Sequence, residues 1–475
     1  MRPARLLLAL AARVADYVGV RVLLVSANRE KLPSPVVPLG LLQVAANLRE
    51  AHEVALCDLC FEEDPHDRLA RDIAAFAPEV IGIGIRNLHT NAYDDTDVLI
   101  DEYAALVRVA RAHTQVPIVL GGSGFSLQAE SLLVRIGADY GVVGEGEHAM
   151  RAVVDQLARG GQPEKLTWAA TAGAGLVRGP MVRTPRTAQE RGELDRLPAA
   201  ARDLVDPRYY EWDGTDNVQT KRGCAFECAY CDYPDLEGRK VRVRDPEAVA
   251  DEMLARSKVP GVTHAFIVDS VFNVPRSHAL AVCAALEARG VPIPWVCYAS
   301  PVNFDDELVG AMARAGCVGV EIGSDAGTTR VLEALRKPFG LAEIFRAREL
   351  FVRHGVLDCH TFVLGAVDET VEEARATLEM VDRLDPDVAA FIVFMEDREA
   401  QSVHRARDRD ALLQMLADEA PKRAGWVVPE LGIRFGGKLA RYVQRAKLRG
   451  PSWLHLAQMR RATRPAARAA SPVDA

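Results

Sequence analysis

Long apolar runs, an excess of positive charge and a framework of paired cysteines are all missing from this sequence. No apolar stretch reaches the length of about 20 residues that a membrane-spanning helix requires. The formal net charge of −8 argues against nucleic acid as the main partner. Six of the nine cysteines are scattered through apolar segments, which is unlike a disulfide-stapled secreted domain. These absences fit a protein of the reducing cytoplasm.

The length and composition predict more than one domain. At 475 residues the chain is too long for one ordinary domain, and an apolar content of 49% is enough for two large cores. Residues 2–12 begin with basic side chains and continue into a short apolar stretch, a pattern that faintly resembles a signal peptide. We interpret residues 1–19 as an extension that is not exported, either an amphipathic helix or the product of a start codon assigned too early.

The other three cysteines, Cys224, Cys228 and Cys231, are clustered in the run Lys-Arg-Gly-Cys-Ala-Phe-Glu-Cys-Ala-Tyr-Cys. Three thiolates are one fewer than a closed tetrahedral metal site needs, and a four-iron, four-sulfur cluster usually takes four. The C-x3-C-x2-C spacing resembles the radical S-adenosylmethionine (SAM) superfamily, whose cluster keeps one iron open for SAM. In this resemblance Tyr230 matches the aromatic position near the SAM adenine. The alternative is three incidental cysteines on a surface loop.

Residues 20–158 alternate β-branched runs with helical segments. We expect strands at 20–26, 54–57, 80–85, 117–120 and 140–143, and helices at 40–50 and 101–112. This alternation predicts an α/β domain with an open, doubly wound (Rossmann-like) parallel sheet, in which ligands bind beyond the carboxyl ends of the strands. The candidate ligand contacts in the loops at those ends are Asn87, Gly121, Gly122, Ser123, Glu145, Gly146 and Glu147.

An ordered set of short motifs covers most of the same region. It comprises Pro-Leu-Gly-Leu-Leu at 38–42, His-Glu-Val at 52–54, Pro-Glu-Val-Ile-Gly-Ile at 78–83, Val-Leu-Gly-Gly at 119–122 and Ala-Asp-Tyr-Gly-Val-Val-Gly-Glu-Gly-Glu at 138–147. The set resembles the cobalamin-binding domain that precedes many radical SAM cores. The resemblance implies cobalamin as a further cofactor, held by the loop residues named above. The alternative is a sheet of this type that has lost its ligand.

One departure concerns the cobalt ligand. Many cobalamin domains carry Asp-x-His-x-x-Gly after the first strand, but residues 27–32 here contain no histidine. The run that begins Asp64-Pro65-His66 imitates the motif, yet it follows the second predicted strand and lacks the glycine. We interpret it as a helix start capped at Asp64. The pair Cys57 and Cys60 has metal-binding spacing, although packing is the more common role of such buried thiols.

Residues 216–396 repeat strand and helix six times. The predicted strands are 219–220, 264–268, 295–299, 318–322, 359–364 and 388–394, and the predicted helices are 246–256, 277–289, 305–315, 328–336, 341–354 and 370–383. Six parallel units with the cysteine loop after the first strand match the partial, TIM-like (β/α)6 barrel of radical SAM enzymes. Active residues of α/β barrels lie at the carboxyl ends of the strands.

Those strand ends hold polar candidates. By the same resemblance Asp269, Ser300, Glu321, Ser324 and Asp325 would contact SAM, and a helix-cap or ion-pair role is the alternative for each acidic residue. A basic residue, Lys337, follows the fourth unit, as in relatives. The strand cysteines are interpreted as core residues: Cys297, Cys317 and Cys359.

The flanking segments have a different composition. Residues 159–215 form a linker, for which we expect a short hairpin and then a strap between the domains. Within residues 397–475, a stretch dense in Arg and Lys begins at Arg405, Arg407 and Arg409, and we expect a small helical region that covers the barrel mouth and determines substrate specificity. Its last dozen residues have the composition of a disordered tail.

Taken with the resemblance, these features imply an enzyme. A [4Fe–4S] cluster would cleave SAM to a 5′-deoxyadenosyl radical, and methylcobalamin would supply a methyl group to an unactivated carbon of a small metabolite or natural product. Flavodoxin or ferredoxin would donate the electron. One alternative keeps both cofactors but catalyses a cyclisation, rearrangement or oxidation. Another is a cluster-bearing sensor without turnover.

Overall fold

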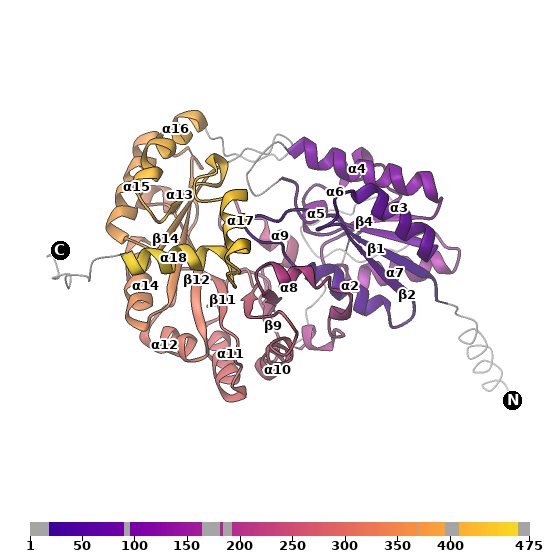
Figure 1. The fold of residues 1–475 in the computed structure, drawn as a ribbon, viewed down its shortest axis with the longest axis horizontal. Coiled ribbons are helices and arrows are strands. Elements are labelled where there is room, and N and C mark those ends of the chain that lie inside the picture. Colours follow the sequence, from indigo (N-terminus) through magenta and orange to yellow (C-terminus); the bar gives the residue numbers. More distant parts are fainter. Residues whose placement is uncertain are drawn as a thin grey trace.

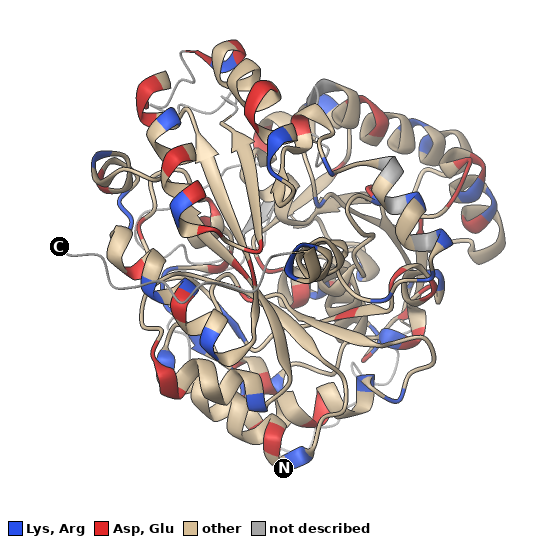
Figure 2. Cartoon of the chain, turned by 60° about the vertical axis from the view of Figure 1, so that its left-hand side comes forward, with Lys and Arg blue, Asp and Glu red and all other residues tan. Residues whose placement is uncertain are grey.

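The computed structural model describes residues 19–89, 96–163, 181–183, 192–366, 368–394 and 408–463. Two parallel sheets lie side by side, each enclosed by helices (Figure 1). Lys, Arg, Asp and Glu are interspersed over the outer helices, whereas the strands are largely free of them (Figure 2). Within the described residues, no helix is long and apolar enough to cross a membrane. The expected extension at 1–18, Arg405, Arg407 and the final residues lie outside the described ranges.

The first sheet confirms the predicted doubly wound domain. Its strand order is β2-β1-β3-β4-β5-β6, and every pair is parallel. The strands are β1 (Arg21–Ser26), β2 (Glu53–Asp58), β3 (Val80–Gly84), β4 (Ile118–Gly121), β5 (Tyr140–Val143) and β6 (Met181–Arg183). The strand β6 was not expected, because it lies in the predicted linker. There it extends the sheet in parallel with β5, and the rest of the expected hairpin lies outside the described residues.

Helices cover both faces of this sheet, which is why its strands read as continuous apolar runs. The helices α3 (Pro65–Phe76), α4 (Thr96–His113) and α6 (Ala129–Ile136) pack on one face, and α2 (Leu39–Leu48) and α7 (Gly146–Ala158) on the other. A short helix, α5 (Ser123–Leu127), follows β4. The cap predicted for α3 is confirmed, since the Asp64 carboxylate accepts hydrogen bonds from the backbone amides of His66 and Asp67.

The second sheet confirms the predicted partial barrel and extends it. Its order is β15-β14-β13-β12-β11-β10-β7, again all parallel. The strands are β7 (Thr215–Val218), β10 (His264–Ile267), β11 (Trp295–Ala299), β12 (Cys317–Asp325), β13 (Leu357–Leu364), β14 (Val388–Val393) and β15 (Trp426–Val427). The first strand thus begins earlier than predicted, and β15 is a seventh strand that the sequence did not indicate.

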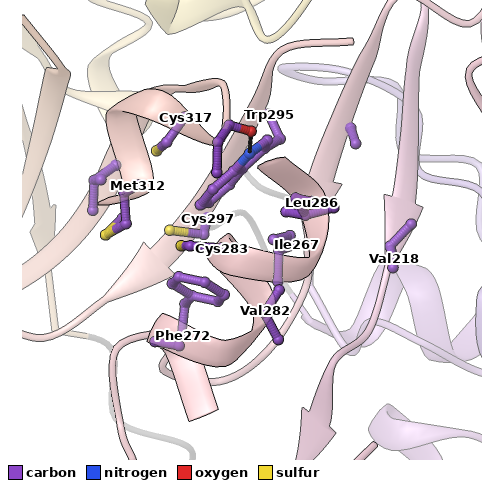
Figure 3. Close-up of a cluster of buried hydrophobic side chains, with 14 of the residues drawn as sticks. Val218, Ile267, Phe272, Val282, Cys283, Leu286, Trp295, Cys297, Met312 and Cys317 are labelled. Atoms are coloured by element: carbon purple, nitrogen blue, oxygen red, sulfur yellow. Dashed lines mark hydrogen bonds between the residues drawn. The ribbon is translucent and has the colours of Figure 1, made fainter. Parts of the chain in front are cut away.

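The helices of the barrel pack on its outer face. They are α10 (Pro246–Arg256), α11 (Arg276–Arg289), α12 (Asp306–Arg314), α13 (Thr329–Ala334), α14 (Leu341–His354), α15 (Val371–Leu384) and α16 (Arg409–Glu419). Figure 3 shows part of this core, where the Trp295 indole donates to the Ala315 carbonyl over 2.7 Å. Cys297 and Cys317 lie in it, and Cys359 lies in a separate apolar cluster, so their predicted core role is confirmed.

The last described helix, α18 (Ser452–Thr463), does not cover the barrel mouth as predicted. Its Leu454 and Ala457 pack with Val296, Leu357 and Val388, which lie at the amino ends of their strands. The helix therefore closes the end of the barrel opposite to the mouth. The sequence could not indicate this, because the apolar stripe of a helix does not reveal which end of a barrel it will meet.

A buried ionic network joins α18 to the barrel. Arg348 donates to Asp358 over 2.8 Å and to Asp387 over 3.1 Å, and Arg461 of α18 donates to Asp387 over 2.9 Å. Burial alone would raise the pKa of Asp358, but His360, whose Nε2 lies 3.7 Å from the carboxylate, and the charge of Arg348 hold it below the usual range. Asp358 thus stays ionised, and it faces the buried guanidinium group of Arg348.

Replacing Asp387 should test this network. We expect Asp387→Ala to lower the free energy of unfolding by about 3–5 kcal/mol, because it leaves buried guanidinium charge uncompensated. Urea denaturation monitored by tryptophan fluorescence measures the change. The control is Asp306→Ala, which removes exposed pairs with Arg353 and His354 and should change the free energy of unfolding far less, because solvent screens them. Equal effects of the two variants would contradict the role given to the network.

Candidate functional site

A large cavity lies at the carboxyl edge of the first sheet, with a volume of about 760 Å³. Its lining includes the ends of β1, β3, β4 and β5 on one side, and residues of β7 and α10 on the other. In a sheet of order 2-1-3, the crevice where ligands bind is at the switch between β1 and β3. Of the predicted cobalamin contacts, the cavity is lined by Gly121, Gly122, Ser123, Glu145, Gly146 and Glu147.

The wall of this cavity suits a bulky, largely apolar ligand. Leu24, Val119 and Val142 form part of its floor, and the glycines at the ends of β3, β4 and β5 expose backbone at its edge. No histidine is among the described residues that line it, and His66 lies elsewhere, at the start of α3. The lining thus offers van der Waals contact and backbone hydrogen bonds instead of an imidazole ligand for a metal.

Asn87 is the predicted cobalamin contact that does not line this cavity. Its carbonyl accepts a hydrogen bond from the Tyr103 hydroxyl over 2.7 Å, and it borders a separate cavity of about 150 Å³. The neighbouring Arg86 lines the large cavity instead. The predicted position was therefore one residue away from the side chain that the fold directs to the cavity.

Glu145 and Glu147 join the two domains. Arg222, two residues before the first loop cysteine, pairs with Glu147 over 2.6 Å and with Glu145 over 3.2 Å, and Arg242 is also paired with Glu145. Burial alone would raise the pKa of the Glu145 carboxyl, but these two guanidinium groups hold it below its usual value. The loop that contains Glu145 and Glu147, which was predicted to face a cofactor, thus also holds the segment before the cysteine loop against the first domain.

The cysteine loop follows the short strand β8 (Lys221–Arg222), which pairs with β9 (Arg242–Val243). Gly223 has φ of +90°, and a Cβ there would lie 2.4 Å from the Lys240 carbonyl oxygen, so only glycine fits at this turn. The amide of Cys224 donates to the Gly238 carbonyl over 3.1 Å, and that of Ala229 donates to Leu335 over 3.0 Å. Both ends of the loop are therefore fixed by backbone hydrogen bonds.

The three thiols of the loop are free and lie close enough to influence one another. Burial raises the pKa of Cys231 to about 11, and the backbone amide of Tyr233 opposes this; Cys228 and Cys224 raise it further. Across the described ranges, no three Cys, His, Asp or Glu side chains converge on a single ion. In a four-iron cluster, by contrast, each cysteine binds a different iron.

A triad holds the loop from the barrel side. The Tyr230 hydroxyl donates to Asp325 over 2.6 Å, Lys337 donates to the same hydroxyl over 3.1 Å, and Lys337 is also paired with Asp325. The Lys337 ammonium stands 4.7 Å from the centre of the Tyr230 ring. Burial alone would lower the pKa of Lys337, but Asp325 and Cys228 raise it. A positive charge is thus kept beside the thiols.

Asp269 and Ser324 have their polar atoms used within the fold. The Asp269 carboxylate accepts from the amide of Thr220 over 2.7 Å and from that of Lys221 over 3.2 Å, and it pairs with the Lys221 ammonium. Ser324 shares a hydrogen bond of 2.7 Å with His360. Both residues are fully buried, which favours a structural role over contact with SAM.

Ser300 and Glu321 differ from those two residues. The buried Ser300 hydroxyl has no hydrogen-bond partner among the described residues, so it can serve a ligand at the end of β11. Glu321 lies between Val320 and Ile322, which pack against the outer helices, so its side chain points into the barrel. Burial raises the pKa of Glu321 to about 7.

Sequence reasoning missed Arg222, Arg242 and Trp453. The position of Arg222 beside Gly223 was a usable signal, since a buried arginine so near the cysteines needs an acidic partner. Trp453 carried no such signal, because its contact with the barrel depends on how α18 packs.

Comparison with known proteins agrees with this arrangement. The B12 binding domain family matches residues 25–154, and the radical SAM superfamily matches residues 218–381. Tryptophan 2-C-methyltransferase of Streptomyces laurentii is 27% identical over 426 residues, which cover 77% of this chain and 71% of that protein. An uncharacterized methyltransferase of Pyrococcus horikoshii is 26% identical over 359 residues, covering 75% of each protein.

Solved structures give the same result. The radical SAM methyltransferase TsrM of Kitasatospora setae, with tryptophan and a SAM analogue bound, superposes with a TM-score of 0.68 at 26% identity, covering 79% of this chain and 73% of that one. A second TsrM structure contains cobalamin and a [4Fe–4S] cluster. The chain therefore belongs to the radical SAM enzymes that carry an N-terminal cobalamin-binding domain, and its cofactors are a [4Fe–4S] cluster, SAM and cobalamin.

Proposed function

We propose that this enzyme transfers a methyl group to an unactivated carbon of a small metabolite or natural product. The observation that carries the proposal is the ionic link between Arg222 and the acidic pair Glu145 and Glu147. It joins the edge of the large cavity to a residue two positions before Cys224. Methyl transfer to a substrate radical requires the methyl donor and the radical-forming site to share one closed space, and this link holds the two sites together.

We propose roles for the chain's own residues on that basis. Cys224, Cys228 and Cys231 bind three irons, and the free hydroxyl of Ser300 donates to SAM. The Tyr230 ring, fixed by Asp325, lies against the adenine. When bound, the cluster supplies the electron that cleaves SAM, and cobalamin supplies the methyl group.

The surroundings of the reaction follow from the same proposal. The apolar cavity lining, with Gly121, Gly122, Ser123 and Gly146 at its edge, excludes water from the cobalamin. We propose a cytoplasmic location, because the cluster needs a reducing compartment. We also propose that flavodoxin or ferredoxin donates the electron to the cluster. We propose no nucleic-acid partner, in keeping with the net charge of −8.

The cluster assignment can be tested by removing its ligands. Anaerobically reconstituted protein should hold one four-iron cluster, and the triple replacement of Cys224, Cys228 and Cys231 by alanine should abolish it. Iron analysis and visible absorption measure the effect. Replacing Cys283 and Cys317 instead, which lie in the apolar core, should leave the iron content unchanged in the protein that folds. Iron retained in the triple variant would disprove the assignment.

The cobalt environment gives a second test. We expect cobalamin to bind with its nucleotide tail detached and without a histidine ligand, because no described residue of the cavity lining is a histidine. Paramagnetic resonance of the Co(II) form should therefore show no nitrogen hyperfine splitting. A splitting that disappears in His66→Ala would mean that the imitation motif at Asp64 is the true ligand loop.

The stoichiometry of SAM use separates methyl transfer from the other reactions of this family. Methyl transfer should yield 5′-deoxyadenosine and S-adenosylhomocysteine in equal amounts, both tracking the methylated product. One SAM is cleaved reductively and the other gives up its methyl group. Chromatography of the reaction with substrate present measures the ratio. Deoxyadenosine without S-adenosylhomocysteine would favour a cyclisation, rearrangement or oxidation.

A further inference from the structure

The inner face of the barrel carries one acidic side chain among aromatic ones. Glu321 on β12 is directly opposite Tyr298 on β11 and Cys359 on β13. Cys297 and Ala299, on either side of Tyr298, point to the outer core, so Tyr298 faces inward like Glu321. The centres of the Tyr298 and Phe266 rings are 4.8 Å apart. Tyr298 is 40% exposed although it projects from the middle of a sheet, which means that accessible space borders it.

Trp453 forms the floor beneath Glu321. A Cβ at Gly319 would lie 2.6 Å from the Trp453 ring, so the missing side chain of this glycine is what admits the indole to the sheet. The buried Trp453 indole nitrogen makes no hydrogen bond of good geometry in the part of the chain that the structure describes, although it lies near enough to Glu321 to lower the pKa of that carboxyl. Tyr298 and Trp453 are therefore neighbours of Glu321, and the Phe266 ring continues this aromatic surface beyond Tyr298.

The charge of Glu321 is not balanced within the protein. It forms no ion pair with any described residue, unlike Asp325 and Glu147. Its burial raises the carboxyl pKa to about 7, and Trp453 lowers it only in part. A carboxylate removed from water without a partner is costly, and a cation brought by a ligand would remove that cost. Aromatic faces attract cations as well.

Glu321 is also deeper in the barrel than the groups that hold the cysteine loop. Asp325 lies four residues further along the strand, at its carboxyl end, where it binds Tyr230. SAM must reach the open iron beside that loop. The floor around Trp453, at the amino end, is therefore on the far side of Glu321 from the cluster, and Glu321 faces the space between them.

We propose that Glu321 anchors the substrate through a protonated nitrogen, and that the substrate is a small aromatic amine or a similar planar cation. This assignment rests on the proposed function, since it places the substrate in the barrel below SAM. It replaces the predicted contact of Glu321 with SAM. The rings of Phe266, Tyr298 and Trp453 enclose the aromatic part, and the carboxylate fixes its orientation towards the mouth.

Two probes that share a ring and differ in charge can test this proposal. Tryptamine carries an ammonium group and indole-3-propionate a carboxylate, each at the end of a short chain on the same indole ring. Isothermal titration should show that the cofactor-loaded enzyme binds tryptamine at millimolar concentration or better, and at least tenfold more tightly than indole-3-propionate. In Glu321→Gln the preference should disappear. The control Glu343→Gln, at the exposed start of α14, should keep it.

The pH dependence gives an independent reading. Tryptamine keeps its proton between pH 6 and 8, as alkyl amines do. Its binding should therefore strengthen as the pH rises through the pKa of Glu321, and the dependence should be lost in Glu321→Gln. The surrounding barrel wall raises the pKa of Tyr298, which borders the interior space, and burial raises that of Cys359, so neither group ionises in this range. The charged group that acts on Tyr298 from the first domain is Arg86.

Several outcomes would overturn the proposal. They are failure of the enzyme to bind tryptamine, equal binding of the two probes, or unchanged tryptamine binding in Glu321→Gln. Loss of SAM binding in Glu321→Gln, measured by SAM-induced changes in the cluster's paramagnetic resonance, would show that Glu321 binds SAM and not the substrate. These measurements need no turnover. An enzyme that binds tryptamine through Glu321 yet forms no S-adenosylhomocysteine would contradict the proposed methyl transfer and leave the role of Glu321 supported.

Discussion

The placement of Arg222 is the constraint on which the two-domain arrangement depends. This residue is at the start of the cysteine loop, and its guanidinium group is held by carboxylates from the other domain. A rigid guanidinium group paired with two carboxylates fixes direction as well as distance, which a point charge such as lysine would not do. The cysteine loop and the edge of the large cavity therefore cannot shift independently without breaking a buried ion pair.

Other contacts across the same boundary support this constraint. The Tyr209 hydroxyl donates to Asp58 at the end of β2, and the Asn217 amide donates to the Val37 carbonyl before α2. Val37, Leu42 and Cys60 of the first domain also belong to the core of the barrel. Since apolar burial and polar contacts coincide there, the boundary resembles the interior of one domain more than a transient interface.

The sequence predicted what local patterns determine. Continuous apolar runs revealed the strands, and the residues that follow them indicated the cavity edge, because parallel strands bring their carboxyl ends together. What it missed depends on tertiary packing. Asp269 and Ser324 are at strand ends as expected, but the partner of Asp269, Lys221, comes from β8 in a separate sheet, and the partner of Ser324, His360, comes from the neighbouring strand β13. The position of α18, and with it the role of Trp453, depends on contacts between segments more than 100 residues apart.

The placement of α18 also has a consequence for biosynthesis. The chain emerges from the ribosome amino end first, so the strands of the barrel are made before the helix that fills their open end. Until residues 452–463 are released, Val296, Leu357 and Val388 lack the apolar cover that Leu454 and Ala457 provide, and Asp387 lacks its pair with Arg461. The first sheet has all its strands by residue 183 and can fold earlier. Completion of the barrel therefore waits for the synthesis of α18, and a chain truncated before α18 would expose the apolar floor that chaperones and proteases recognise.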